Sequence, residues 1–256
     1  MLCEDNNIIS RNPETDTQRK VKPGVALYLL PVTMSDGDPA DVLPQSNLML
    51  IRQLRHFVVE NVRTARRFLK RVDRTIDIDA LSFVELSEHT PDADIPAMLD
   101  PILRGDAIGV MSEAGCPAVA DPGARLVEAA QSRAIRVVPM VGPSSILLAL
   151  MASGMNGQRF TFNGYLPIDD KTRENTLRNM AAQIARTDTT QIFIETPYRN
   201  NKLIHKMTAV LPASMKLCIA ADITGAAESI VTRTLAEWKR TDFDYDKTPA
   251  IFVLGR

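Results

Sequence analysis

The stretch 108–123, with the sequence IGVMSEAGCPAVADPG, constrains the fold more than any other part of the chain. It begins with an apolar run, 108–111, which predicts a strand buried on both faces. The next six residues, 112–117, suit neither a strand nor the interior of a helix, because Gly115 permits a positive φ and Pro117 lacks an amide donor. We therefore expect a buried strand that ends in a tight loop of small residues.

A short helix and a second strand follow this loop. Asp121 and Pro122 are typical of an N-cap and a first helical position, so we expect a helix over about 124–133. The apolar run 135–140 predicts the second strand, and 141–145 is again a loop of small residues. Ligands of open α/β sheets bind beyond the carboxyl ends of the strands. This βαβ unit therefore predicts that both loops line one cleft.

Length and composition are those of an ordinary globular protein. The 256 residues allow one or two domains, and the formal net charge of −1 means that nucleic-acid binding requires a local basic patch. The three cysteines, Cys3, Cys116 and Cys218, are widely spaced, which indicates a reducing compartment rather than a disulfide scaffold or a metal site. No apolar run reaches about 18 residues, and the first residues lack the pattern of a signal peptide. We expect a cytoplasmic protein with no membrane partner.

The first half of the chain predicts one α/β domain, residues 23–156, behind a polar arm at 1–22 that we expect to be disordered. A strand at 24–30 leads into the loop 31–39, whose many turn residues make it a candidate ligand wall. The other elements expected here are a helix and then a strand within 47–60, a short strand at 81–86, a helix at 95–103 and a helix at 146–152. Glycines within 153–157 end the last helix and mark the domain boundary.

The densest basic stretch of the chain lies on a predicted amphipathic helix, 61–72. Its apolar residues recur every three or four positions, as on one face of a helix. The opposite face carries the basic residues Arg63, Arg66, Arg67, Lys70 and Arg71. Two interpretations stay open: a solvated helix face, or a stripe that contacts phosphates with Arg63, Arg66 and Arg67 as its candidate residues.

The second half of the chain predicts another α/β domain, residues 157–256. Its apolar runs and amphipathic stretches alternate without an internal repeat. The expected elements are strands at 159–163, 190–195, 216–221, 228–234 and 250–254, and helices at 171–185 and 200–210.

Five motifs, in order and at consistent spacing, resemble those of one known family. They are VVENVR at 58–63 (similar to AEDTR), SEAGCPAVADPG at 112–123 (similar to SDAGTP…DPG), VGPSS at 141–145 (similar to a PGP loop), NGYLP at 163–167 (similar to EGFLP) and FIETPYR at 193–199 (similar to FYESxHR). The family is the tetrapyrrole methylase superfamily of class III S-adenosylmethionine (SAM)-dependent methyltransferases. Within it, the chain is similar to the branch that methylates the 2′-hydroxyl of a cytidine in 16S ribosomal RNA.

The resemblance implies a tetrapyrrole methylase-like fold of two α/β domains, with SAM in the cleft between them, and a homodimer. Free amides at the start of the helix after Ser144 suit the SAM carboxylate, and Glu113 suits its ammonium or sulfonium. The cofactor-binding residues it indicates are Pro31, Glu113, Ala114, Gly115, Cys116, Ser144, Ser145, Glu195, Ala220, Ala221, Pro249 and Ala250.

The chain departs from the branch mainly where the methyl acceptor is expected. The loop 31–37 lacks the Gly-Asn pair of the branch's PTPIGNL, Asn61 replaces the aspartate of AEDTR, and 220–224 lacks the arginine of ARELT. The expected reaction is methyl transfer from SAM to a ribose 2′-hydroxyl of ribosomal RNA or the small ribosomal subunit, with Glu60 as candidate general base. Two alternatives stay open: a SAM-dependent methyltransferase of a tetrapyrrole or another small molecule, and a SAM-binding protein without catalysis.

Overall fold

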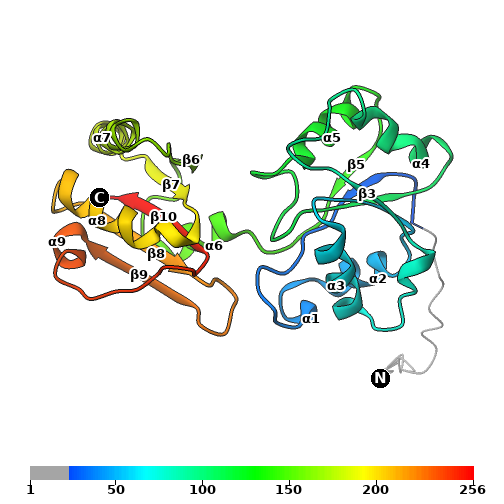
Figure 1. Cartoon of the computed structure of the whole chain (residues 1–256), viewed down its shortest axis with the longest axis horizontal. Coiled ribbons are helices and arrows are strands. Elements are labelled where there is room, and N and C mark those ends of the chain that lie inside the picture. The colour runs from blue at the N-terminus through cyan, green and yellow to red at the C-terminus, as the bar shows by residue number, and fades with distance from the viewer. Residues whose placement is uncertain (1–22) are drawn as a thin grey trace, which may run out of the picture.

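The protein consists of two α/β domains that lie side by side (Figure 1). The structure, a computed structural model, describes residues 23–256. Over this range each domain is built on one five-stranded sheet, which confirms the predicted α/β class with two domains. The arm expected at 1–22 lies outside the described residues. No helix within 23–256 combines the length and the apolar character needed to cross a membrane.

The sheet of the N-terminal domain is parallel throughout and has the strand order β3-β2-β4-β1-β5. Its strands are β1 (Leu27–Leu29), β2 (His56–Val59), β3 (Ser82–Glu85), β4 (Ile108–Met111) and β5 (Val137–Pro139). Every residue of β4 is buried, because apolar side chains leave it towards separate cores on the two faces of the sheet. The predicted strand at 108–111 is therefore confirmed.

Helices cover both faces of this sheet. One face carries α1 (Pro39–Val42), α2 (Gln45–Ile51) and α3 (Val62–Val72), and the other carries α4 (Asp100–Leu103) and α5 (Gly123–Gln131). The amphipathic helix α3 is confirmed, and Asn61 caps it by accepting hydrogen bonds from the amides of Arg63 and Thr64. A further 3₁₀ turn spans Ile78–Ala80.

Two helix predictions in this domain need correction. The helix expected over 95–103 is a 3₁₀ helix, Ile95–Leu99, followed by the single turn α4. Pro96 and Pro101 lie within this segment, and neither has an amide donor for a continuous α-helix. Helix α5 begins at Gly123, one residue earlier than expected, and Asp121 accepts a hydrogen bond from the Gly123 amide at 2.7 Å without being the N-cap itself.

The sheet of the C-terminal domain is mixed and has the strand order β6-β7-β10-β8-β9, in which only β6 and β7 are parallel. Its strands are β6 (Phe160–Tyr165), β7 (Thr190–Ile194), β8 (Lys216–Ala221), β9 (Ser229–Thr234) and β10 (Ala250–Gly255). The outer face is covered by α7 (Asp170–Thr187), α8 (Asn200–Val210) and α9 (Leu235–Trp238). Helix α9, which the sequence analysis missed, begins at a capping box formed by Thr234 and Glu237.

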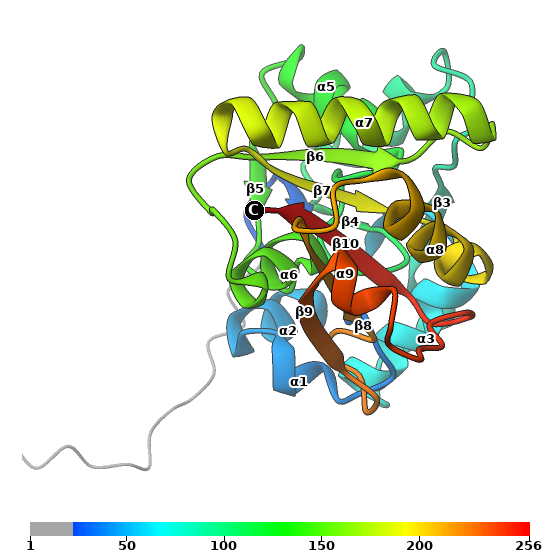
Figure 2. The ribbon, with the colours of Figure 1, turned by 90° about the vertical axis from the view of Figure 1, so that its left-hand side faces the viewer.

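The inner face of this sheet is covered by α6 (Ser145–Ser153). Ala149 and Leu150 of α6 pack there against Cys218 and Ile251, and Figure 2 shows α6 behind the sheet, on the side of the N-terminal domain. The helix ends, as predicted, at a glycine, Gly154, with a φ of 71°. By this packing α6 belongs to the C-terminal domain, so the connection between the domains lies before α6 and not at 153–157.

Candidate active site

The loops that follow β1 and β4 meet at the edge of the N-terminal sheet that faces the C-terminal domain. All strands of this sheet are parallel, so their carboxyl ends lie on one edge. The Val32 amide donates to the Gly115 carbonyl at 2.9 Å, which joins the loop after β1 to the loop after β4. The Cys116 Sγ lies 3.3 Å from the Pro143 carbonyl in the loop after β5. The prediction that the loops 112–117 and 141–145 come together is therefore confirmed.

Glycine is needed at two positions of this junction. Gly115 has a φ of +69°, a conformation that costs an ordinary residue about 1–2 kcal/mol. A side chain at Gly142 would overlap the ring of Pro31, because the loops after β1 and β5 pass each other there. Burial raises the pKa of the nearby Cys116 thiol, which leaves it a packing residue and not an activated nucleophile.

A cavity of about 370 Å³, here called the central cavity, lies between these loops and the C-terminal sheet. This volume is in the range of about 300–1,000 Å³ that is usual for small-molecule sites. The N-terminal domain contributes Met34, Glu60, Ser112, Ala114, Val119, Ala120 and Asp121, and the C-terminal domain with its helix α6 contributes Ser145, Tyr165, Ile194, Glu195, Pro197, Ala220, Asp222, Ile223, Pro249, Ala250 and Ile251.

The charged side chains that line the central cavity are all acidic. They are Glu60, Asp121, Glu195 and Asp222, and none of the described residues that line it is Lys, Arg or His. Such a cavity favours a ligand that carries positive charge.

Two of these carboxylates each have one buried oxygen that lacks a hydrogen-bond partner among the described residues: Oε2 of Glu195 and Oδ2 of Asp121. The other oxygen of Glu195 accepts from the Thr196 amide at 2.7 Å and forms an ion pair with Arg199 at 2.8 Å. The other oxygen of Asp121 accepts from the amides of Ala118 and Gly123. Since buried polar atoms are normally paired, both free oxygens fit donors on a ligand.

Asp121 lies close enough to Glu60 to influence its ionisation. Burial is the main cause that raises the pKa of Glu60, and the negative charges of Glu113 and Asp121 raise it further. One Glu60 oxygen accepts a hydrogen bond from the Glu113 amide at 3.2 Å, which acts in the opposite direction. Burial also raises the pKa of Asp121. A carboxylate with a raised pKa in a cavity suits general base catalysis.

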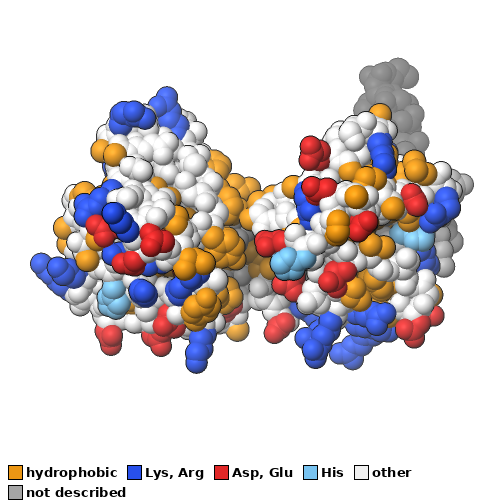
Figure 3. All heavy atoms as spheres, turned by 45° about the horizontal axis from the view of Figure 1, so that its top comes forward, with side chains coloured by type: hydrophobic (Ala, Val, Ile, Leu, Met, Phe, Trp, Pro, Cys, Tyr) orange, Lys and Arg blue, Asp and Glu red, His pale blue; other side chains and the backbone are white. Residues whose placement is uncertain are grey.

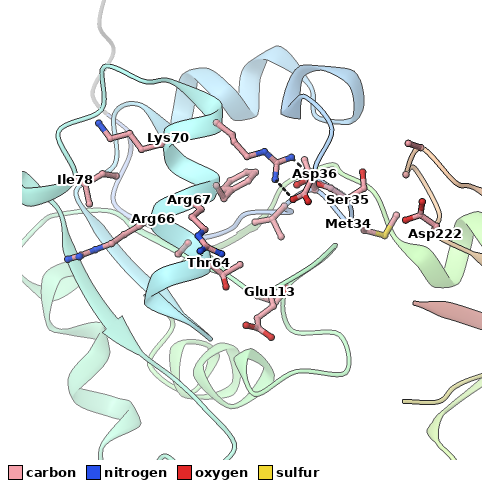
Figure 4. Close-up of a pocket in the computed structure, with 18 residues that line it drawn as sticks. Met34, Ser35, Asp36, Thr64, Arg66, Arg67, Lys70, Ile78, Glu113 and Asp222 are labelled. Carbon is pink, nitrogen blue, oxygen red and sulfur yellow. Dashed lines mark hydrogen bonds and ion pairs between the residues drawn. The ribbon is translucent and has the colours of Figure 1, made fainter. Parts of the chain in front are cut away.

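A second and larger cavity, of about 980 Å³, adjoins the central cavity and shares Met34, Ser112 and Asp222 with it. We call it the basic cavity, because α3 contributes four cationic side chains to its lining, Arg66, Arg67, Lys70 and Arg71, against the three carboxylates of Asp36, Glu113 and Asp222 (Figure 4).

Most of these cations are engaged in contacts within the protein. Lys70 donates to the carbonyls of Arg74 and Ile76. The Arg66 guanidinium lies 5.4 Å from the centre of the Phe83 ring. Arg67, by contrast, has no hydrogen bond or ion pair within residues 23–256, and Figure 4 shows it extending from α3 towards Glu113. Arg67 is therefore available to an anionic ligand.

Arg71 has a different role, because it holds the loop 31–37. It donates to the carbonyls of Ser35 and Gly37 and lies 3.8 Å from the Asp36 carboxylate. The Ser35 hydroxyl in turn donates to the Thr224 carbonyl of the C-terminal domain at 2.9 Å. The predicted ligand wall at 31–39 is thus tied to both domains, and its residue Met34 separates the two cavities.

The structure places the predicted cofactor residues in different parts of the site and its surroundings. Ala114, Ser145, Glu195, Ala220, Pro249 and Ala250 line the central cavity. Pro31, Gly115 and Cys116 build the loop junction, Ser144 is the N-cap of α6, and Glu113 lines the basic cavity. Ala221 packs in the outer core of the C-terminal domain, because successive side chains of a strand point to opposite faces. Ala221 is not among the residues that line the central cavity, whereas Ala220 is.

The residues predicted to act on the methyl acceptor lie in different places. Glu60 lines the central cavity, and Arg66 and Arg67 line the basic cavity, whereas Arg63 lines neither. The sequence analysis missed Asp121 and Tyr165 as lining residues. Both lie within motifs that it had singled out, at 112–123 and 163–167. Asp121 is interpreted there as a helix start, and Tyr165 lies beyond the strand predicted at 159–163.

The sequence model of one protein family, the tetrapyrrole (corrin/porphyrin) methylases, matches residues 43–239 of this chain. The chain belongs to the tetrapyrrole methylase family. Membership confirms the resemblance that the motifs indicated, and with it a SAM-dependent methyltransferase. The carboxylates of the central cavity fit a cofactor that carries an ammonium and a sulfonium.

Proteins named ribosomal RNA small subunit methyltransferase I are similar to this chain. The one from Vibrio cholerae is 30% identical over 223 residues, which cover 86% of this chain and 73% of that protein. The one from Haemophilus influenzae is 33% identical over 175 residues, which cover 67% of this chain and 60% of that protein. These relatives indicate the branch within the family.

Solved structures of the family share the fold at low identity. The methyltransferase CobJ aligns with a TM-score of 0.59 and 14% identity, over 90% of this chain and 92% of CobJ. A uroporphyrin-III C-methyltransferase from Thermus thermophilus in complex with S-adenosylhomocysteine aligns with a TM-score of 0.53 and 17% identity, over 90% of this chain and 97% of that one. Both alignments span the two domains.

Proposed function

We propose that this protein transfers a methyl group from SAM to a ribose 2′-hydroxyl of a cytidine in small-subunit ribosomal RNA. The observation that carries the proposal is the basic cavity beside the central cavity, with Arg67 free for a phosphate. The relatives named as small-subunit ribosomal RNA methyltransferases support the same acceptor. The shared lining residues Met34, Ser112 and Asp222 are where an acceptor and the cofactor would meet.

In this proposal both domains hold the cofactor in the central cavity. The free oxygens of Asp121 and Glu195 accept hydrogen bonds from its donor groups, the ammonium in particular. Helix α6 starts at Ser145 without a side-chain cap, so its first amides are available to the cofactor carboxylate. Ala220, Ile223 and Ile251 offer apolar walls for the adenine.

SAM supplies a methyl group bound to a positively charged sulfur, which a hydroxyl oxygen can attack in line. The chain's own contribution is to hold the hydroxyl in that line and to exclude water. Glu60 is positioned to accept the proton of the hydroxyl at one of its carboxylate oxygens, and its raised pKa suits this role. Arg67 holds a phosphate of the RNA and so fixes the position of the ribose.

The experiment is methyl transfer from radiolabelled SAM to small ribosomal subunits of a strain that lacks the protein. Label in the RNA at a cytidine ribose is the expected result. Label on a small molecule from the extract supports the alternative of a small-molecule methyltransferase, and SAM binding without any transfer supports a binding protein. Either of these two outcomes overturns the proposed function.

Arg63 provides a matched control for Arg67, because both lie on α3 and only Arg67 lines the basic cavity. Arg67→Ala should weaken RNA binding and lower the slope of log affinity against log salt by about 1. Arg63→Ala should leave both quantities nearly unchanged. Equal effects of the two variants would show that α3 acts only through its general charge.

We also propose that the protein is a cytoplasmic homodimer. The support is an apolar surface on α6, where Leu147 and Met151, four residues apart, are 51% and 77% exposed, with Val141 75% exposed before the helix. A surface of this kind is typical of a contact with another chain, and a second copy of this one is the proposed partner. Sedimentation analysis tests it.

A further inference from the structure

The end of β6 contains an irregularity that changes the direction of one side chain. The pairing register between β6 and β7 shifts between Phe162 and Tyr165, and Gly164 between them has a φ of +61°. Bulges of this kind bend a strand and re-aim a side chain, and they are frequent beside active sites. Here the side chain after the shift is that of Tyr165, which lines the central cavity.

Tyr165 differs from the other three tyrosines of the chain. Tyr28 donates its hydroxyl to the Gly24 carbonyl, the Tyr245 ring contacts Phe243 and Trp238, and the Tyr198 ring lies under the Arg199 guanidinium. The Tyr165 side chain has neither a hydrogen bond nor a ring contact with any residue in 23–256, and Tyr165 is 62% exposed. A large aromatic side chain at a cavity and without a protein partner points to a ligand.

The surroundings of Tyr165 suit a flat, uncharged ligand. Val119 lines the same cavity from the N-terminal domain and is 49% exposed, and Pro197 adds a further apolar surface. Figure 3 shows hydrophobic side chains gathered where the two domains face each other. The acidic side chains of the central cavity repel a phosphate but not a neutral base, whereas the basic cavity attracts the phosphate.

The adenine of the cofactor is a less suitable partner for this ring. More than half of the Tyr165 surface is exposed to solvent, whereas a cofactor adenine needs an enclosed wall. The apolar side chains of Ile223 and Ile251, which line the same cavity and are 7% and 6% exposed, provide such a wall.

We propose that the Tyr165 ring stacks on the base of the target nucleotide when RNA is bound. Proteins commonly receive the unstacked bases of single-stranded RNA on aromatic side chains. Tyr165 is then a binding and specificity-determining residue, while Arg67 holds the phosphate. This inference rests on the proposed function, because it requires RNA as the acceptor.

The test compares Tyr165→Ala, Tyr165→Phe and Ile168→Ala. Ile168 is a matched control, because it is 75% exposed and lies three residues further on but does not line the central cavity. The first readout is the affinity of the protein saturated with S-adenosylhomocysteine, which has no methyl group to transfer, for a single-stranded RNA that contains the target cytidine. The second is the affinity for SAM by calorimetry. Both readouts are independent of turnover.

Tyr165→Ala should weaken RNA binding about tenfold, while Tyr165→Phe and Ile168→Ala stay within about twofold of the wild type, because stacking needs the ring and not the hydroxyl. SAM affinity should be the same for all four proteins. Unchanged RNA affinity of Tyr165→Ala overturns the proposal, and so does weaker SAM binding, which would make Tyr165 a cofactor contact. If the wild type binds RNA but transfers no methyl group, the proposed reaction is refuted. The RNA affinities of the variants then still decide whether Tyr165 contacts RNA.

Discussion

The substitution Asp121→Asn separates ligand binding from folding at the central cavity. One carboxylate oxygen of Asp121 accepts hydrogen bonds from the amides of Ala118 and Gly123, at 3.0 and 2.7 Å. An asparagine must keep its side-chain oxygen at this place, because its NH₂ group cannot accept a hydrogen bond from either backbone amide. The NH₂ group of the asparagine then takes the place of Oδ2, the acceptor oxygen that has no partner among the described residues.

The expected effect on SAM binding follows from this exchange. The variant loses one hydrogen bond from the ligand to a charged acceptor, which is worth about 1.5–3 kcal/mol, and its NH₂ group faces a donor of the ligand. The dissociation constant for SAM, measured by calorimetry, should therefore rise about 10- to 150-fold. A constant within twofold of the wild-type value would refute the assignment of Asp121 to the cofactor.

The effect on stability should have the opposite sign. Burial raises the pKa of Asp121 in the folded protein above its usual value of 3.8, so the ionised carboxylate costs stability at neutral pH. Asparagine carries no charge, and the midpoint of thermal unfolding at pH 7 should stay the same or rise. The advantage of the variant should disappear below about pH 3.8, where Asp121 is protonated in both states. A loss of stability at pH 7 would show that the charge supports the loop.

Three further predictions concern the cavity and its surroundings. Glu60→Gln should lower kcat about 10²- to 10⁴-fold. The wild-type kcat should fall as the pH decreases, with a midpoint above 4.5, because burial raises the pKa of Glu60 and only its ionised form accepts a proton. The pH–rate profiles of both proteins check this. Gly115→Ala should lower the midpoint temperature of unfolding by about 2–8 °C, because Gly115 has a φ of +69°. Gly157→Ala should leave the midpoint unchanged, because a Cβ at Gly157 meets only open space. Scanning calorimetry compares the two variants. Replacing Leu147 and Met151 together by Asp should convert a dimer into a monomer in sedimentation experiments, and an unchanged mass would place the interface elsewhere.

The order of the elements could be predicted from the sequence because apolar runs and amphipathic spacing dominate it. The bounds of α8 and β8 agree with the predicted ranges, since both elements are framed by polar or turn residues. The side on which α6 packs could not be predicted. This helix is apolar around most of its circumference, so the sequence gives no single face that selects one of the two sheets.

The candidate site was predictable in its loops but not in the direction of its side chains. Ala220 and Ala221 are both small and buried, and no alternation of polar and apolar residues indicates which of them faces the cavity. Asp121 has the signature of a helix start, and the structure uses only one of its oxygens for that purpose. The direction of the Tyr165 side chain depends on the register shift beside Gly164, and the alternation of residues along a strand does not predict such a shift.

The separation of charge between the two cavities links the fold to the proposed reaction. The acids of the central cavity come from both domains, so a positively charged cofactor would attract the two domains to each other. The cations of the basic cavity all come from α3, which is one continuous helix and needs no closure to present them. The two regions meet at Met34 in the loop that Arg71 fixes to α3 and Ser35 fixes to the Thr224 carbonyl. A change at this loop therefore alters both cavities, whereas a change at Arg67 or Glu195 alters only one.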